Sequence, residues 1–172
     1  MKQFLIIGTL NAVTYKEVFP LIKENKVWLG VTRTGIGSMW FKVPETSPEK
    51  EGQKIENGVR YQTIGTSIWL TNLDHKKRHE ELLLYKKYNA EKYPKYDNYD
   101  AIEVGKVTDI PMDYDGIAGV PITFLGKHCP EQFEIIGEMV TAKLTEYNFG
   151  YSIINGKKKY ARILIKKILT KR

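Results

Sequence analysis

Short apolar runs separated by polar stretches mark the first 75 positions of the chain. Residues 4–7 are continuously apolar and end at a glycine, which is the pattern of a strand buried on both faces of a sheet. An i, i+3, i+4 apolar stripe at Val18, Leu21 and Ile22 predicts a helix, and residues 27–31 form a second apolar run. Strand, helix and strand in this order predict a βαβ unit whose two strands pair in parallel.

The sequence also indicates where this helix should begin and end. Thr14 followed by Glu17 fits a capping box at its start. Pro20 should shorten or kink the helix, and Asn25 can close it in the left-handed conformation.

The rest of the chain favours strands. Polar residues 44–58, which include two prolines and two glycines, predict a surface loop or a long hairpin. Asn155-Gly156 predicts a turn that leads into a last strand. Apolar or alternating runs predict further strands or buried segments at 39–43, 59–64, 67–70, 121–125, 133–136 and 160–165.

Composition limits the class of protein. The chain has 172 residues, 42% of them hydrophobic, which is enough to build a core and excludes disorder for most of its length. The apolar run near the start is far shorter than a signal-peptide core or a membrane span, so we expect a cytoplasmic protein without a membrane partner. Its single cysteine, Cys129, excludes a disulfide within the chain and a Cys-rich zinc site.

The net charge of +7 is unevenly distributed. Eight Lys and Arg residues and no acid follow position 156, so the preceding residues are nearly neutral overall. A second basic excess lies at 75–95, with seven Lys and Arg against three Glu, and is followed at 96–115 by six acids against one Lys. Basic character favours nucleic acid as a partner but does not establish it.

Tyrosines and lysines alternate through residues 85–99. Cations neutralise phosphates while aromatic rings stack on bases, so this segment predicts nucleic-acid binding. A helix that packs its tyrosines on a sheet and turns its lysines to solvent is an equally good interpretation. In the last strand, Lys158, Tyr160 and Arg162 would share one face, which suits either a phosphate backbone or a charged edge strand that resists aggregation.

Three other patterns have weaker support as sites of chemistry. Residues 35–37 read Gly-Ile-Gly but lead into a predicted strand, which favours a hairpin turn over a phosphate-binding loop. His75 and His79 are spaced i, i+4, yet the cations between them disfavour a metal and favour a solvated helix face. His128 beside Cys129 would be the signature of a small enzyme, although adjacency in sequence does not make a catalytic pair.

Several long blocks resemble a known family. Residues 4–30, 68–74, 93–104 and 109–137 are similar to the EcoRI-type adenine-specific DNA methyltransferases, and the resemblance is weakest at 44–58 and 138–156. Those enzymes bind S-adenosylmethionine through a Gly-rich loop and hold adenine with an Asn/Asp-Pro-Pro-aromatic tetrapeptide. This chain has neither feature, and no two of its prolines are adjacent. The resemblance therefore implies the C-terminal portion of such an enzyme.

The resemblance implies an α/β fold, with a partial methyltransferase-like (Rossmann-type) sheet in residues 1–75 and a smaller β-rich target-recognition module in residues 76–172. It further implies the DNA-binding part of an N6-adenine methyltransferase of a restriction-modification system. S-adenosylmethionine would serve the full enzyme, whereas this chain alone is expected to bind no cofactor and to be inactive. The implied partners are double-stranded DNA and either an N-terminal catalytic part or a second copy. The alternative is a protein-interaction or oligomeric module that binds no DNA.

Residue chemistry then selects candidates for contact with DNA. Tyr96, Asn98 and Tyr99 are predicted to contact bases, because Asn can pair bidentately with adenine in the major groove. The predicted phosphate contacts are the cations Arg33, Lys76, Lys77, Arg78, Lys86, Lys87, Lys92, Lys95, Lys157, Lys158, Lys159 and Arg162.

Overall fold

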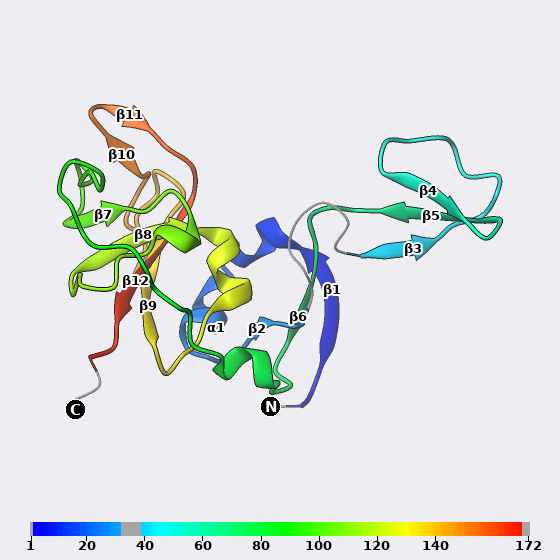
Figure 1. Cartoon of the computed structure of the whole chain (residues 1–172), viewed down its shortest axis with the longest axis horizontal. Helices are drawn as coiled ribbons and strands as arrows, with labels where there is room; N and C mark the ends of the chain where they lie inside the picture. Colours follow the sequence, from blue (N-terminus) through cyan, green and yellow to red (C-terminus); the bar gives the residue numbers. More distant parts are fainter. Residues whose placement is uncertain (1, 32–38, 170–172) are drawn as a thin grey trace.

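The computed structural model describes residues 2–31 and 39–169. In these ranges short strands form four small sheets, and the helices are few and brief (Figure 1). The protein therefore contains both helices and strands, which agrees with the broad α/β class predicted from the sequence. None of its described helices has both the length and the apolar character needed to cross a membrane.

The first sheet contains β1 (Leu5–Thr9), β6 (Ser67–Thr71) and β2 (Trp28–Leu29), in the order β1-β6-β2. The central strand β6 pairs antiparallel with both neighbours, so β1 and β2 are not hydrogen-bonded to each other. The predicted parallel pairing is therefore wrong. Local periodicity located both strands correctly, but it carries no information on a strand from much later in the chain that inserts between them.

Strand β1 is much more exposed than its sequence predicts. Leu5, Ile6 and Ile7 retain 53%, 54% and 50% of their surface, although side chains alternate between the two faces of a strand. The strand lies at the edge of its sheet, and β6 is its only partner among the described residues. The prediction that both faces of this strand are buried is therefore wrong for the structure of this chain.

The segment between β1 and β2 forms two short helices instead of one. A 3-10 helix, η1 (Leu10–Thr14), is followed by α1 (Phe19–Lys23), whose first turn contains Pro20. Asn25 has φ 54°, which confirms the predicted left-handed closure. The predicted capping box does not form, because the Thr14 hydroxyl donates to the carbonyl of Asn11 at 2.9 Å.

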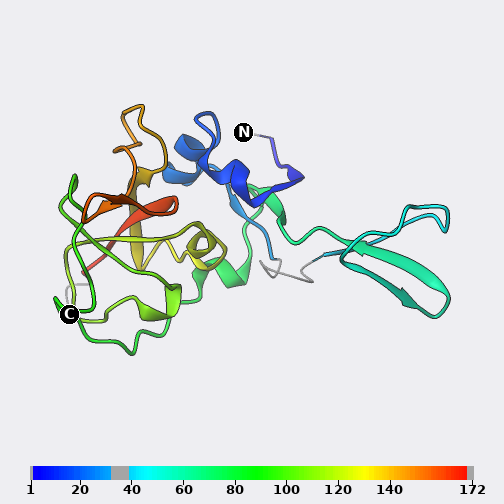
Figure 2. The same ribbon diagram turned by 90° about the horizontal axis from the view of Figure 1, so that it is seen from above.

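A three-stranded antiparallel arm projects away from the rest of the molecule in both views (Figures 1 and 2). Its strands are β3 (Trp40–Lys42), β5 (Val59–Thr63) and β4 (Gln53–Glu56), in that order. Asn57 and Gly58, with φ 51° and 74°, make the turn between β4 and β5, which confirms the hairpin alternative for residues 44–58. No residue from 39 to 66 is buried, so the arm has no core of its own.

The largest sheet has the order β7-β8-β12-β9. It consists of β7 (Ala101–Glu103), β8 (Ile117–Pro121), β12 (Arg162–Lys167) and β9 (Phe133–Met139), and only the β7–β8 pair is parallel. β12 is an interior strand whose residues 162–165 are all buried. The predicted strand is confirmed, but the charged edge is wrong because β12 lies between β8 and β9. Arg162 is buried on β12 and Lys158 belongs to β11, so the two do not share a face of one strand.

Short elements surround this sheet. Strands β10 (Ile153–Ile154) and β11 (Lys157–Lys158) form a hairpin around the predicted Asn155-Gly156 turn, where both residues have positive φ. The remaining elements are the 3-10 helices η2 (Lys76–His79), η3 (Val107–Asp109) and η4 (Ile122–Lys127).

One hydrophobic core crosses the predicted boundary between residues 75 and 76. Val13, Phe19 and Ile68 from the first region belong to the same buried cluster as Phe124 and Phe133 from the second. The two regions therefore share their apolar interior, and this packing holds α1 against the largest sheet.

Candidate nucleic-acid interface

The tyrosine–lysine segment from residue 80 to 100 has no helix. It runs as an irregular chain fixed at isolated points, with single bridges from Lys86 to Pro111 and from Lys95 to Ile102. The amide of Tyr88 donates to Asp113 Oδ1 at 2.7 Å. The helical interpretation of this segment is therefore wrong.

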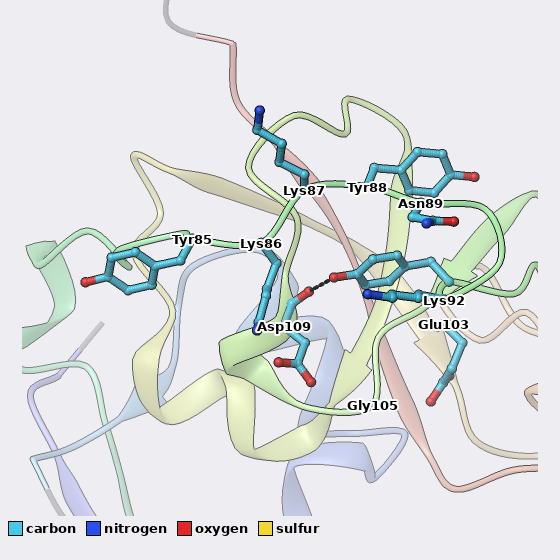
Figure 3. A pocket seen from close by; sticks show the side chains of 10 residues that line it. Tyr85, Lys86, Lys87, Tyr88, Asn89, Lys92, Glu103, Gly105 and Asp109 are labelled. Carbon is cyan, nitrogen blue, oxygen red and sulfur yellow. Dashed lines mark hydrogen bonds between the residues drawn. The ribbon is translucent and has the colours of Figure 1, made fainter.

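This segment lines an open pocket of about 540 Å³ (Figure 3). Lys86, Lys87 and Lys92 are exposed, and none of them forms a salt bridge within the described part of the chain. The pocket is lined by Tyr85, Lys86, Lys87, Tyr88, Asn89, Lys92, Tyr93, Glu103, Gly105 and Asp109. We call Tyr85, Lys86, Lys87 and Lys92 the lysine–tyrosine surface.

The tyrosines of this segment divide into structural and exposed residues. Tyr93 is buried, donates its hydroxyl to the carbonyl of Asp109 at 2.8 Å, and stacks on Tyr88 with ring centroids 5.9 Å apart. Tyr88 also packs against Tyr114 at 4.7 Å. Tyr85 remains 74% exposed, so its ring is available to stack on a ligand.

Tyr96 and Arg162 belong to the protein interior. Arg162 is 7% exposed, and its Nε donates to both carboxylate oxygens of Glu103 at 3.0 Å. Tyr96, 5% exposed, donates its hydroxyl to the same carboxylate, and burial together with this bond raises the pKa of the Tyr96 phenol. Both side chains are satisfied inside the fold, so neither is available for the DNA contact predicted from the sequence. Glu103, which sequence reasoning did not single out as their partner, holds both in place.

The other predicted base contacts lie beside the β10–β11 hairpin. Asn98 Nδ2 donates to the carbonyl of Tyr151 at 3.0 Å, and the Tyr99 ring packs on Phe149 with centroids 4.8 Å apart. The Lys158 ammonium lies 3.4 Å from the centroid of the Tyr151 ring. Here the fold brings together predicted residues that are more than 50 positions apart.

Other cations of the predicted set are distributed over the surface. Lys157 and Lys159 are exposed on the same hairpin, and Lys95 pairs with Asp100 at 2.7 Å. Lys76 and Lys77 are exposed on η2.

Arg78 has a structural environment. Its guanidinium lies 4.0 Å from the Trp28 ring centroid and donates to Asn25 Oδ1 at 2.8 Å, and burial lowers the pKa of Arg78. Arg33 and the glycines at 35 and 37 lie outside the described residues.

His79 forms a clamp between two carboxylates. Its Nε2 lies 2.8 Å from Asp74 Oδ1, and its Nδ1 lies 2.8 Å from Glu131 Oε1. These hydrogen bonds raise the pKa of His79, since both ring nitrogens can donate only in the charged imidazolium. His75 instead contacts the carbonyl of Leu29, so the two histidines do not converge. In the described ranges no group of His, Cys, Asp and Glu has an arrangement suited to a metal.

His128 and Cys129 do not form a nucleophile–base pair. The Nε2 of His128 hydrogen-bonds the carbonyl of Phe133 at 2.8 Å, and burial lowers the pKa of His128. The Cys129 thiol donates to Glu131 Oε2 at 3.2 Å, and burial raises the pKa of the Cys129 thiol. A raised pKa keeps the thiol protonated and unreactive, which argues against the small-enzyme alternative.

Comparisons with known proteins agree with the resemblance of the sequence blocks. A family described as adenine-specific methyltransferase EcoRI matches residues 1–168. The type II methyltransferase M.EcoRI of Escherichia coli is 52% identical over 169 residues, which cover 96% of this chain and 50% of that protein.

Two mycoplasma proteins are also similar. M.MgeORF184P of Mycoplasma genitalium is 37% identical over 185 residues, and M.MpnI of Mycoplasma pneumoniae is 36% identical over 182 residues. Both are type II methyltransferases, and the matches cover 96% of this chain and 57% and 56% of theirs. The chain thus spans about half the length of these relatives. No solved structure matches it.

Proposed function

The chain belongs to the family of the adenine-specific methyltransferase EcoRI, and we propose that it is the DNA-binding, target-recognition part of such an enzyme. The full enzyme would transfer a methyl group from S-adenosylmethionine to adenine N6 within a restriction-modification system. Residues 1–75 would continue the methyltransferase sheet, and residues 76–172 would read the DNA.

The observation that carries this proposal is the lysine–tyrosine surface. Three exposed lysines without salt bridges in the described structure border an open pocket beside an exposed tyrosine ring. Such a combination suits a phosphate backbone together with a stacked or rotated base.

The proposed interface is narrower than the set predicted from the sequence. It omits Tyr96 and Arg162, which are buried, and Arg78, which is held by Trp28 and Asn25. It also leaves out Arg33, which lies outside the described residues. Besides Tyr85, it retains Lys76, Lys77, Lys86, Lys87, Lys92, Lys95, Asn98, Tyr99, Lys157, Lys158 and Lys159.

Two features support a catalytic part outside this chain. The sequence contains neither a Gly-rich loop after a first strand nor a pair of adjacent prolines, so it offers no family-type donor loop or adenine clamp. The aliphatic side chains of β1 are half exposed on an edge strand, which suits coverage by further polypeptide. The catalytic half of the enzyme is the partner we propose for this strand.

Fluorescence anisotropy with a labelled DNA duplex tests the proposal. If the lysines at 86, 87, 92 and 157–159 each neutralise one phosphate, log affinity should fall against log salt with a slope of about −5. Absence of binding at low ionic strength, or binding that does not respond to salt, would show that this part does not bind DNA electrostatically.

The exposed β1 also favours a second candidate, a protein-interaction module without DNA binding. Static light scattering, combined with the DNA-binding measurement, separates the two candidates. A stable oligomer that does not bind DNA would support the second candidate, and a monomer that binds DNA would support the first.

A further inference from the structure

Two hairpins of the described chain close on an Asn-Gly turn. Asn57-Gly58 joins β4 to β5 in the arm, and Asn155-Gly156 joins β10 to β11. All four residues have positive φ, as a type I′ turn requires. The two hairpins lie at opposite ends of the molecule (Figure 1), so they offer the same local structure in two different surroundings.

Of the two, the β10–β11 hairpin is the basic one. Residues 155–160 are all exposed and contain three lysines and no acid. Tyr160 at the end of this run is 83% exposed. Residues 39–66 of the arm, in contrast, have four basic and four acidic side chains. Only the β10–β11 hairpin of this pair therefore has a charge that suits a polyanion.

Several contacts hold the β10–β11 hairpin in one orientation. Ile154 is buried in the same apolar cluster as Leu164 of β12. The Ser152 hydroxyl donates to the carbonyl of Tyr160 at 2.7 Å, and the amide of Lys159 donates to the carbonyl of Ser152 at 2.7 Å. The hairpin is therefore formed before any ligand arrives, which lowers the entropy cost of binding.

Asp97 clamps the tip of this hairpin. Its Oδ1 accepts from the amide of Asn155 at 3.0 Å, and its Oδ2 accepts from the amide of Gly156 at 2.7 Å. Its own amide donates to the carbonyl of Ile153 at 2.8 Å. The carboxylate also places a negative charge beside the turn, which disfavours a phosphate at that point. The tip therefore suits an uncharged group, while the lysines that follow it suit phosphates.

The tip presents one side chain that can recognise a base. Asn155 is exposed, and its side-chain amide forms no hydrogen bond with residues 2–31 or 39–169. An Asn amide can pair bidentately with the N6 amino group and N7 of adenine in the major groove. That groove is also wide enough to admit a two-stranded β-ribbon.

One DNA duplex can reach both this hairpin and the lysine–tyrosine surface. Asp97 follows Lys92 by five positions, so their Cα atoms are at most about 18 Å apart. DNA rises about 3.4 Å per base pair, so this distance corresponds to about five base pairs.

We propose that the β10–β11 hairpin enters the major groove of DNA, where Asn155 recognises an adenine, the lysines at 157–159 contact phosphates, and Asp97 is a positioning residue for the turn. The inference rests on the proposed DNA-binding function. It adds to that function the side chain that selects a base and the side chain that holds it in place.

Selection from a randomised pool of DNA duplexes, followed by sequencing, tests the role of Asn155. We expect the native chain to enrich a sequence with a fixed adenine, and Asn155→Gly to reduce the preference at that base pair about tenfold. Glycine keeps the positive φ of the turn, so the hairpin still forms. Asn57→Gly makes the same change in the arm and should leave every base preference unchanged.

A duplex with 7-deazaadenine at the selected position tests the contact itself, because this base lacks the N7 acceptor. In fluorescence anisotropy the native chain should bind this duplex about threefold to tenfold more weakly, whereas Asn155→Gly should bind both duplexes equally. Asp97→Ala removes both acceptors of the turn amides and should reduce the adenine preference. Asp97→Asn keeps one acceptor and should give an intermediate preference.

The results separate this inference from the proposed function. Salt-dependent DNA binding without selection of a base, or an adenine preference and 7-deaza effect that Asn155→Gly leaves unchanged, would overturn the inference alone. A full preference in Asp97→Ala would overturn the positioning role of Asp97. Absence of DNA binding by the native chain at low ionic strength would overturn both the inference and the proposed function.

Discussion

The buried acid Glu138 should make the stability of the protein depend on pH. Burial raises the pKa of Glu138 from 4.5 to about 8, so the folded state favours the protonated form. The stability that this group contributes is therefore fully present below its unfolded pKa and is lost as pH rises toward the folded value. With 1.36 kcal/mol per pKa unit, the loss between about pH 5 and about pH 7 amounts to about 2.5 kcal/mol.

Glu138→Gln isolates this effect because glutamine does not ionise. Urea unfolding gives the free energy of unfolding of both proteins at each pH. The free energy of the variant minus that of the native protein should increase by about 2.5 kcal/mol between about pH 5 and about pH 7. His79 and His128 titrate in both proteins, so their contributions cancel in the difference. Glu134→Gln, an exposed change on the same strand, is the matched control and should give a parallel curve. A constant difference between Glu138→Gln and the native sequence would refute the reasoning.

Three further predictions concern the described contacts. The carboxylates of Asp74 and Glu131 raise the pKa of His79 in the folded state. Their hydrogen bonds to the imidazolium should therefore stabilise the protein at pH values below the pKa of His79 in the unfolded state, and this stabilisation should be lost as pH rises through its pKa in the folded state. His79→Ala should flatten the pH dependence of the thermal unfolding temperature over that pH range. Gly119→Ala places a Cβ against a buried tyrosine ring and should cost about 1–3 kcal/mol in urea unfolding, whereas Gly105→Ala, with no atom within 4 Å of its Cβ, should have a much smaller effect. Arg162→Met leaves the buried Glu103 carboxylate without its cation and should lower the free energy of unfolding by about 3–5 kcal/mol. Equal urea midpoints for the variant and the native protein would contradict this prediction.

Much of the secondary structure was predictable because it depends on local residue chemistry. The apolar runs located most strands, and Asn25 and Asn155 marked sites of positive φ. Pairing was not predictable, since hydrogen bonds between strands join residues far apart in sequence. β6 separates β1 from β2, and β12 occupies the interior of the largest sheet despite its many basic residues.

The sequence predicted which segment of the chain forms the candidate interface, but it did not predict which side chains of that segment are exposed. The lysines at 86, 87 and 92 were identifiable, because interleaved Lys and Tyr residues are a local pattern. The roles of Arg162 and Tyr96 depend on Glu103, which lies 59 positions from Arg162, so sequence alone could not assign them to the interior. The exposure of the β1 side chains was not predictable either, because the edge position of β1 depends on its pairing with β6, which lies far along the chain.

The most direct test of the central claim compares two charge-matched triple variants in DNA-binding titrations over a range of salt. One replaces Lys86, Lys87 and Lys92 with Gln, and the other replaces the exposed residues Lys2, Lys42 and Lys50. We expect the first variant to lose about three units of the salt slope and the second to keep the native slope. Equal loss of affinity and slope in both variants, or none in either, would contradict the assignment of this surface to DNA.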